Sequence, residues 1–513
     1  MPLRPATWRL RVSWWTHILV AAGIGLFSSG LAALVALVLL VDALTVPACE
    51  AATPAAPKFG VAPFAFDPEA RAKAFVHAMA NDEFRTAYEM LAPEQWGAES
   101  LCAYSLEGFW RTLTASEARL TLVHVSDRPK FAPMYNRLEV PLRLTLESAE
   151  GQREVYVQVN LLSDARITGY EVDHAMTEVG EVQVYPPPPY AELDAFEESD
   201  VSVGQAPWEL GGVLTIPHGL GPFPAAVLLG GGDRDGTGAT TKLTRDLAWG
   251  MASKGVATVR IDRRTSAHAL AAARQPVFTI DEELVDDALA AIELLRRTPR
   301  IDPARIYIFG GSHGGFAAPR VAQRDPNVAG LIIANSPSGK LSDFIWRHVR
   351  HKARLDGEVT ENEERYIRAT DAQAAALNAW LSGREVPLDI SVHRGFYGHL
   401  GMYSPAAVAS DLPIRLFILA VEWDRIVPPE DAETWIEQLR PRRHVAFRLY
   451  RGHNHALRDV SNLTEPDPMP GGHMSRQVVA DIAAWIHDEW TDRWCADQAA
   501  WYAGCRGGSS PTG

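Results

Sequence analysis

One serine of this sequence stands in a setting that suits nucleophilic chemistry. Gly310-Gly311-Ser312-His313-Gly314-Gly315 follows directly after the apolar run at 306–309. Gly-x-Ser-x-Gly between a strand and a helix is typical of a serine held on a turn so tight that its neighbours must be glycine. An ordinary tight turn is the alternative, but the apolar strand before the motif and the helix-compatible residues 316–318 after it favour a nucleophile. We therefore predict that Ser312 attacks an acyl carbon.

A serine nucleophile needs a base, and the base needs an acid that orients it. Glu422 and Asp424 follow one apolar run, and His453 and His455 follow the next one. Because each run reads as a strand, both pairs are expected at the carboxyl edge of a sheet, where open α/β sheets bind ligands. The two histidines could also bind a metal ion together, but no third ligand is placed to complete such a site.

Negative charge that develops on the substrate needs two main-chain N–H donors. The first candidate is His313, which directly follows the serine, and the second is Gly231 or Gly232, which follow the apolar run 225–229. Glycine at this place lets the backbone approach a substrate closely. Chemistry of this kind requires no cofactor and no metal.

The elements that would position these residues alternate between strands and helices from about residue 200 onward. Short apolar runs typical of buried strands lie at 227–229, 256–261, 306–309, 331–334 and 416–420. A helix is predicted over 280–295, with a capping box formed by Thr279 and Glu282 and with Pro299 after its end. This alternation predicts a mainly parallel sheet that is covered by helices on both faces.

Residues 196–490 resemble the α/β-hydrolase superfamily, and they are most similar to dienelactone-hydrolase and prolyl-oligopeptidase-like esterases that carry an N-terminal NTF2-like domain. The segments that carry the resemblance are 210–217, 221–224, 233–236, 259–264 and 312–320. Relatives usually read His-Ser-Leu where this chain has Gly311-Ser312-His313, and their loop at 230–235 is usually slightly longer. The second difference leaves the oxyanion donor open between Gly231 and Gly232.

The resemblance implies an α/β fold of the α/β-hydrolase type, with a doubly wound, mainly parallel sheet and a helical cap. It also implies that the serine, the acid and the histidine of the site follow one another in that order along the chain. Asp424 is favoured over Glu422 because Asp-Arg-Ile-Val-Pro is the usual form of the acid loop in this fold. His455 is favoured over His453 because the last loop usually reads Gly-x-x-His. The expected triad is Ser312, Asp424 and His455.

Residues 336–411 separate two predicted strands and are too many for an ordinary loop. A helix is expected from Phe344 onward and another over 361–381, and insertions at this place in α/β hydrolases form caps over the active site. The cap residues considered for the pocket are His393, Phe396, Tyr397 and His399, with ordinary packing as the alternative role.

Residues 65–184 are predicted to form a small α+β unit that precedes the catalytic domain. Asp67-Pro68 is typical of a helix start, and alternating apolar residues at 138–146 and 155–161 indicate a hairpin. The order of these elements and aromatic residues such as Trp110 resemble NTF2-like, cone-shaped domains. A cone of this kind can hold a ligand, while core packing is the other role for its aromatic residues.

The N-terminus differs from the rest of the chain. Arginines 4, 9 and 11 precede an uncharged run of 24 residues at 18–41. A helix of that length spans about 36 Å, which is enough to cross a membrane. The arginines then predict a cytoplasmic N-terminus and an extracytoplasmic catalytic domain. A cleaved signal peptide and lipoprotein processing at Cys49 are the alternatives.

Composition narrows the choice of function. Lysine and arginine number 49 against 63 aspartate and glutamate, and the resulting net charge of −14 argues against a general nucleic-acid binder. The four cysteines are too scattered for a zinc cluster, although Cys495 and Cys505 could pair in an oxidising compartment.

The predicted units are a cytoplasmic tip and anchor at 1–45, a linker at 46–64, the α+β unit at 65–184, a proline-rich linker at 185–199, the catalytic domain at 200–494 and a tail at 495–513.

Taken together, the sequence predicts a membrane-anchored serine hydrolase that cleaves small acyl esters through an acyl-enzyme. The alternatives are a serine peptidase or an acyl-CoA thioesterase or acyltransferase with the same triad. An inert, tethered binding protein of the cell envelope is a further alternative, which the retained serine, acid and histidine disfavour.

Overall fold

The computed structural model describes residues 64–92, 103–114, 118–149, 151–172, 186–230, 239–388, 393–401, 403–440, 442, 444–460 and 472–489. Several predictions concern residues outside these ranges: the anchor at 18–41, processing at Cys49, the pairing of Cys495 with Cys505, and the donors Gly231 and Gly232. Within the described ranges no helix combines the length and the apolar character that crossing a membrane requires.

The first described unit is an α+β unit built around an antiparallel sheet. Its helices are α3 (Pro68–Ala80), α4 (Phe84–Glu89) and α5 (Ala103–Leu113), and its strands are β1 (Arg119–Val125), β2 (Lys130–Ala132), β3 (Arg137–Ser148), β4 (Gly151–Leu162) and β5 (Ile167–Val172). The strands pair in the order β1-β3-β4-β5, and β2 pairs with β3 beside the short helix η2 (Pro133–Tyr135). Asp67 caps α3 by accepting a hydrogen bond from the Ala70 N–H, as the sequence predicts.

The second sheet has eight strands in the order β13-β12-β11-β10-β8-β9-β7-β6. Their bounds are β6 (Phe196–Val203), β7 (Leu210–Pro217), β8 (Phe223–Leu229), β9 (Ala257–Ile261), β10 (Ile301–Gly311), β11 (Gly330–Ala334), β12 (Arg415–Trp423) and β13 (Val445–Asn454). Strands β8 to β13 all run parallel to one another, whereas β7 runs antiparallel to both β6 and β9. All five predicted apolar runs are strands of this sheet.

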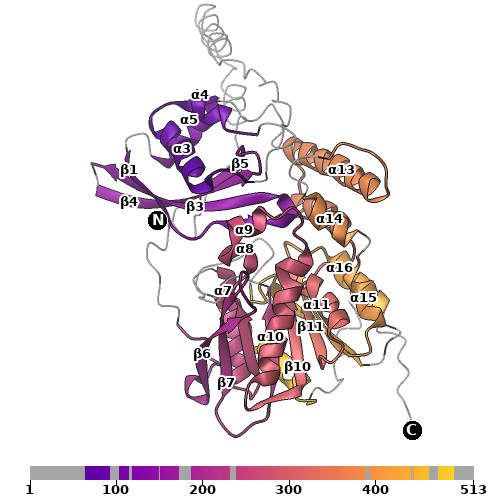
Figure 1. The fold of residues 1–513 in the computed structure, drawn as a ribbon. Helices are drawn as coiled ribbons and strands as arrows, with labels where there is room; N and C mark the ends of the chain where they lie inside the picture. The colour runs from indigo at the N-terminus through magenta and orange to yellow at the C-terminus, as the bar shows by residue number, and fades with distance from the viewer. Residues whose placement is uncertain are drawn as a thin grey trace, which may run out of the picture. The chain divides into compact units, whose positions relative to one another are not determined.

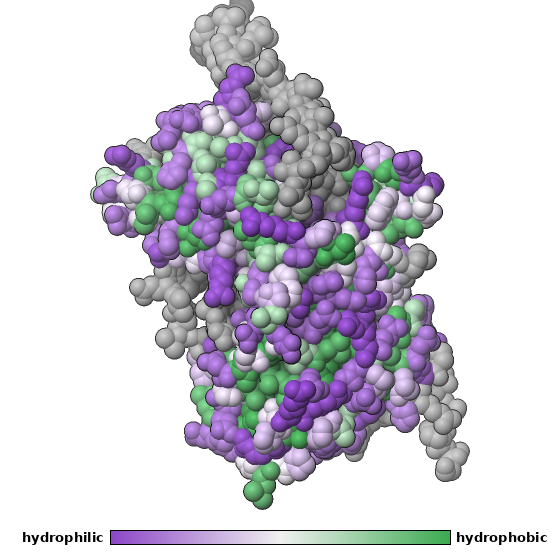
Figure 2. All heavy atoms as spheres, in the orientation of Figure 1, coloured by the Kyte–Doolittle hydropathy of each residue, from purple (hydrophilic) through white to green (hydrophobic). Residues whose placement is uncertain are grey.

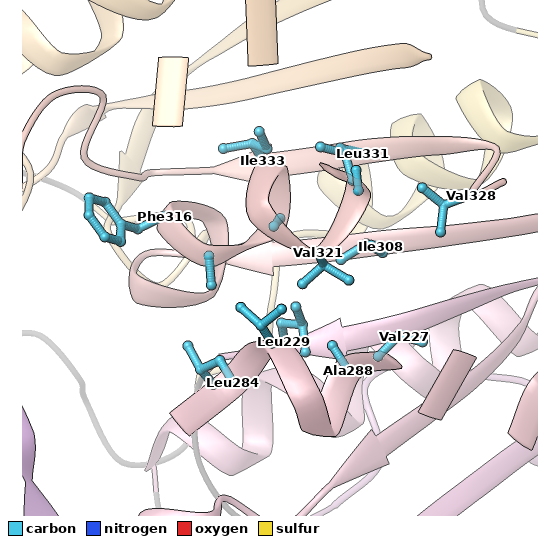
Figure 3. Packing of buried hydrophobic residues seen from close by; sticks show 14 of the residues in the cluster. Val227, Leu229, Leu284, Ala288, Ile308, Phe316, Val321, Val328, Leu331 and Ile333 are labelled. Atoms are coloured by element: carbon cyan, nitrogen blue, oxygen red, sulfur yellow. The ribbon is translucent and has the colours of Figure 1, made fainter. Parts of the chain in front are cut away.

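Helices cover both faces of this sheet because successive residues of each strand point to opposite faces. Val227 and Leu229 of β8 belong to one core, together with residues of α10 (Asp286–Arg297), α11 (His313–Arg324) and α16 (Pro429–Leu439). Figure 3 shows this packing, with Leu284 and Ala288 lying against Val227 and Leu229. The alternate residue Leu228 belongs to the core on the other face, with α7 (Ala239–Ala252) and α17 (Arg476–Ile486). Figure 1 shows α10 and α11 over the strands β10 and β11.

The helix predicted over 280–295 begins differently from an ordinary α-helix. One bond of the expected capping box is present, since the Thr279 N–H donates to Glu282 Oε2 over 2.8 Å, while Thr279 Oγ1 accepts from the Asp281 N–H over 3.1 Å. The next residues form a π-helical turn, η4 (Asp281–Val285), before α10 continues regularly. Such single wide turns inside helices are frequent at functional sites. Here the turn carries Glu283, which is buried.

The described part of the insertion after β11 contains four helices, α12 (Leu341–Ala353), α13 (Glu361–Leu381), α14 (Arg394–Leu400) and α15 (Pro405–Asp411). The predicted helix at 361–381 has these same bounds, and its N-cap Thr360 forms a capping box with Glu363. Two helices of the insertion, α14 and α15, were not expected individually. Their short lengths of 7 residues each give too few turns for a recognisable period.

The antiparallel sheet and the catalytic segment share one hydrophobic core. Between β9 and η4 the chain forms the short helices α8 (Arg264–Ala267) and α9 (Ala269–Ala273), and Ala272, Ala273 and Phe278 are buried in the same cluster as Phe131. The rings of Phe131 and Phe278 meet edge to face, with centroids 5.6 Å apart. Hydrophilic residues cover much of the face shown in Figure 2, with apolar areas between them.

Candidate active site

Ser312 stands on a sharp turn between β10 and α11. Its backbone has φ 52° and ψ −116°, a conformation that residues with a side chain rarely adopt and that costs on the order of 1–3 kcal/mol. The Ser312 N–H donates to the carbonyl oxygen of Ala334 at the end of β11, over 2.8 Å. Strained backbone that is held by its surroundings clusters at active sites, and here it presents the predicted nucleophile.

Two glycines around this turn are required because main chains pass very close to each other. A Cβ at Gly314 would lie 2.2 Å from the carbonyl oxygen of Leu229, and a Cβ at Gly230 would lie 2.6 Å from that of Gly311. Gly230 also has φ +90°. The end of β8 therefore lies directly against the serine turn. This places the start of the predicted oxyanion loop beside Ser312, although Gly231 and Gly232 themselves lie outside the described residues.

The acid loop follows β12, and its carboxylate is fixed by its own backbone. Asp424 Oδ1 accepts hydrogen bonds from the N–H groups of Ile426 and Val427, each over 2.8 Å. The Asp424 side chain is only 8% exposed, so these bonds are shielded from water. A carboxylate held in this way can accept a further hydrogen bond in one fixed direction.

The structure brings Asp424 and His455 together at the ends of β12 and β13. His455 Nδ1 lies 2.8 Å from Asp424 Oδ2 and 2.9 Å from Oδ1. Because an ionised carboxylate can only accept, Nδ1 carries the proton in this contact, and the neutral ring then has Nε2 free of a proton. That tautomer is the one a general base needs.

The two competing residues make other contacts. Glu422 Oε2 accepts a hydrogen bond from the Gly452 N–H over 2.9 Å, so this carboxylate holds the loop that carries the histidine. His453 Nδ1 lies 2.7 Å from the Arg451 carbonyl oxygen, and its buried ring packs against Tyr450. Among the described residues no group of three or more His, Cys, Asp or Glu side chains is arranged to hold a metal ion.

Asn335 directly follows β11 and links it to β12 and to the loop that carries His455, and the sequence does not predict this role. Its N–H donates to the Leu419 carbonyl oxygen over 3.0 Å, and its side-chain Nδ2 donates to the His455 carbonyl oxygen over 2.8 Å. Asn335 is 6% exposed and has φ 47°, which asparagine tolerates better than most residues. An asparagine directly after the strand beside the nucleophile is the signal that could have identified it.

His313 begins α11, and its N–H is one of the first-turn groups that have no acceptor within the helix. Its ring stacks on Phe316, and its Nε2 lies 2.9 Å from Glu283 Oε2, while Arg263 Nη2 lies 3.0 Å from Glu283 Oε1. Burial alone would raise the pKa of Glu283, but His313 and Arg263 hold that pKa below its ordinary value. An ionised, buried carboxylate therefore fixes the side chain of the predicted oxyanion donor.

The four cap residues considered for the pocket are used for packing and for polar contacts within the fold. Phe396 and Tyr397 are buried, and the Tyr397 hydroxyl donates to the Met134 carbonyl oxygen over 3.0 Å. His393 caps α14 by accepting from the Phe396 N–H, and His399 Nε2 lies 3.1 Å from Asp281 Oδ2. These contacts join the cap to the antiparallel sheet and to η4.

The chain is similar to several known proteins. The profile of the Prolyl oligopeptidase family matches residues 247–466. Esterase EstD of Thermotoga maritima is 27% identical over 432 residues, which cover 82% of this chain and 95% of that protein. A hyperthermophilic esterase from the archaeon Pyrobaculum calidifontis is 17% identical with a TM-score of 0.38, over 57% of this chain and 86% of that one. A 2,6-dihydroxy-pseudo-oxynicotine hydrolase is 17% identical with a TM-score of 0.36, over 58% of this chain and 68% of that one.

The chain is a serine hydrolase of the α/β-hydrolase type, as the sequence predicts. This class uses a nucleophile, an acid and a histidine carried in that order on one mixed sheet. Ser312, Asp424 and His455, which the sequence predicts for these roles, directly follow β10, β12 and β13.

Proposed function

We propose that the protein is a carboxylesterase that cleaves small acyl esters through Ser312, Asp424 and His455. The observation that carries the proposal is the contact of His455 Nδ1 with the Asp424 carboxylate, which selects the tautomer that a general base needs. The strained turn that carries Ser312 supports it. The similarity to Esterase EstD, which extends over 95% of that protein, supports an ester as the substrate class.

In this mechanism His455 Nε2 takes the proton of the Ser312 hydroxyl as its oxygen attacks the ester carbonyl carbon. Asp424 keeps the ring oriented and stabilises the imidazolium. The main-chain N–H groups of His313 and of Gly231 or Gly232 donate to the oxyanion. His455 then gives its proton to the departing alcohol, and water attacks the acyl-enzyme with His455 again as the base. The triad needs no cofactor for these steps.

The match to the Prolyl oligopeptidase family favours a peptidase as the second candidate, since only the leaving group differs. A thioesterase or acyltransferase would use the same residues. The deciding experiment assays the purified protein with p-nitrophenyl esters of increasing acyl length, acyl thioesters and aminoacyl p-nitroanilides. Faster turnover of the esters supports the proposal, and faster turnover of the anilides or thioesters would replace it. Absence of both turnover and fluorophosphonate labelling would favour the inert binding protein.

We further propose that residues 18–41 anchor the chain in the cytoplasmic membrane, with the catalytic domain outside. The arginine-flanked apolar run supports this topology. A C-terminal alkaline phosphatase fusion should then be active and a fluorescent-protein fusion dark, and the reverse pattern would refute the orientation. A soluble mature form that begins near Ala51 would refute the anchor.

The α+β unit at 65–184 is proposed to be an NTF2-like domain. Three helices ahead of an antiparallel sheet with the long hairpin β3–β4 support this assignment. Its aromatic residues Phe75, Phe109 and Tyr170 pack against one another, which agrees with a core role. Binding of a ligand inside the cone would show as a rise in Tm on addition of envelope lipids or glycans to the Ser312→Ala protein.

A further inference from the structure

We propose that His348 and His351 of the cap helix α12 are positioning residues that hold the acid loop in its productive place. The inference rests on the proposed function, because it takes Asp424 as the acid of the triad. It goes beyond that function by giving the cap a role in the geometry of the acid, rather than only in covering the substrate.

Both histidines face the acid loop and donate to its main chain. His351 Nε2 lies 2.7 Å from the carbonyl oxygen of Asp424, and His348 Nδ1 lies 2.7 Å from that of Ile426. The two rings are three residues apart on α12, so they project from the same side of the helix. Because a carbonyl oxygen can only accept, each of these nitrogens must carry a proton. A neutral ring and a protonated ring can both supply it.

The two contacts complete a set of bonds that surrounds the acid loop. On the inner side, the Asp424 carboxylate accepts from the N–H groups of Ile426 and Val427. On the outer side, the carbonyl oxygens of Asp424 and Ile426 point to α12. A rotation of the Asp424 peptide that turns its carbonyl oxygen away from α12 therefore breaks the hydrogen bond to His351. Without these two hydrogen bonds from α12, the acid loop would lose this restraint on the position of Asp424.

Helix α12 is itself fixed against the core, so it can act as a support. Arg347 Nη2 lies 2.8 Å from Asp431 Oδ1 in α16, and the same oxygen accepts from the N–H and the hydroxyl of Ser338, each over 2.8 Å. Asp431 is fully buried, so this network is shielded from water. Burial also lowers the pKa of His348, which keeps its ring neutral near pH 7. His348 stacks on Phe344 of the same helix.

The test measures kcat, KM and the pH profile of the full chain with a p-nitrophenyl ester. His351→Ala is expected to lower kcat about tenfold with little change in KM, since one hydrogen bond that orients the acid is lost. The acid limb of kcat/KM should move to lower pH, because a poorly placed carboxylate stabilises the His455 imidazolium less. His351→Gln should restore most of kcat, since its amide nitrogen reaches about as far as Nε2, whereas His351→Asn is too short and should not. For His348, whose donor is Nδ1, His348→Asn is the variant expected to be active.

His487→Ala is the matched control, because His487 Nε2 also lies 2.9 Å from a main-chain carbonyl oxygen, that of Lys254, in another part of the fold. It should leave kcat unchanged. In the Asp424→Ala background, His351→Ala should cost nothing further, since the residue acts through Asp424. Equal kcat for the Gln and Asn variants of His351, or an additive loss in that background, would overturn the inference. Full activity of Asp424→Ala itself would instead overturn the proposed triad.

Discussion

On the nucleophile side of the proposed active site, Ser312 is held mainly by main-chain contacts. On the other side, Asp424 and His455 are held by main-chain N–H groups together with side chains from several elements. The serine turn depends on glycines that let backbones approach within 2.2–2.6 Å of where a Cβ would be. The acid and the base depend on Asn335, Glu422 and the cap histidines. Close contacts between main chains require glycines, which form a local sequence motif. The supporting side chains are far apart in the sequence and form no motif. The serine turn can therefore be recognised in the sequence, whereas the side chains that support the acid and the base are recognised only in the fold.

The largest effect is expected at the nucleophile itself. Ser312→Ala removes the attacking oxygen, and we expect kcat to fall by about 10⁶-fold, as in serine proteases. Labelling by a fluorophosphonate probe should disappear. The thermal unfolding temperature should not fall, which distinguishes loss of chemistry from loss of fold. Labelling that persists in this variant would assign the nucleophile to another residue.

The base should be nearly as sensitive, and the histidine beside it should not. His455→Ala is expected to cost about as much as Ser312→Ala, because members of a triad act as one unit. His453→Ala should change kcat far less and should instead lower stability, since its ring is buried against Tyr450. Assays of kcat alongside urea unfolding separate the two outcomes. An inactive His453→Ala with an active His455→Ala would reassign the base.

The two carboxylates of the acid loop give a third test. Asp424→Asn should lower kcat by about 10⁴-fold, because an amide no longer holds the productive ring tautomer. Glu422→Gln should be mild, since its amide oxygen can still accept from the Gly452 N–H. The measurement is kcat/KM for both variants under identical conditions. Similar losses in the two would mean that Glu422 supports the base more strongly than the contact suggests.

Substitutions at two glycines of the serine turn test whether close main-chain contacts hold Ser312 in place. Gly314→Ala places a methyl group 2.2 Å from the Leu229 carbonyl oxygen, so the turn must shift, and we expect a loss of about 3 kcal/mol in unfolding free energy and about 10² in kcat. Gly311→Ala meets only the Phe309 ring at 3.6 Å and should be tolerated. Urea unfolding measures the change in unfolding free energy of each variant, and ester turnover measures the change in kcat. A tolerated Gly314→Ala would show that the close approach is not required.

The smallest effect is expected at Glu283, whose side chain supports the nucleophile side. Glu283→Gln weakens the contacts to His313 and Arg263 and should cost about 1–3 kcal/mol of stability near neutral pH. Because the pKa of Glu283 is held below its ordinary value in the fold, its contribution is present above about pH 4.3 and is lost as pH falls through the lowered pKa. Unfolding at pH 7 and pH 3 should therefore show a difference between wild type and variant that shrinks at the lower pH. A difference that grows on acidification would contradict the assignment.

Much of the fold follows from local patterns in the sequence. The five buried strands are visible as apolar runs, and the helix at 361–381 is visible from its capping box and its length. Strand β6 is not predicted from the sequence, because most of its residues are exposed and its apolar residues are few. The π-helical turn at 281–285 was read as ordinary helix, since both periods fit so short a stretch.

Less of the site follows from the sequence. Ser312 lies within a motif of six residues, and Asp424 and His455 each follow a strand at a recognisable distance. Asn335, His348 and His351 lie in no such motif, and their roles depend on contacts between residues that are 120, 78 and 73 positions apart. Only the packing of the cap against the acid loop brings those partners together.

The hydrophobic core that Phe131 shares with Phe278 has a consequence for the order in which this chain can fold during synthesis. The last described strand of the antiparallel sheet ends at residue 172, but α9 and Phe278, which belong to the same core, are about 100 residues further along. At roughly 5–20 residues per second, a ribosome needs on the order of 5–20 s to supply them. During that interval the sheet emerges with part of its apolar face uncovered, which is a natural binding surface for a chaperone. A fragment that ends near residue 190 would remain in that state indefinitely, so truncations of this protein are best placed after residue 278.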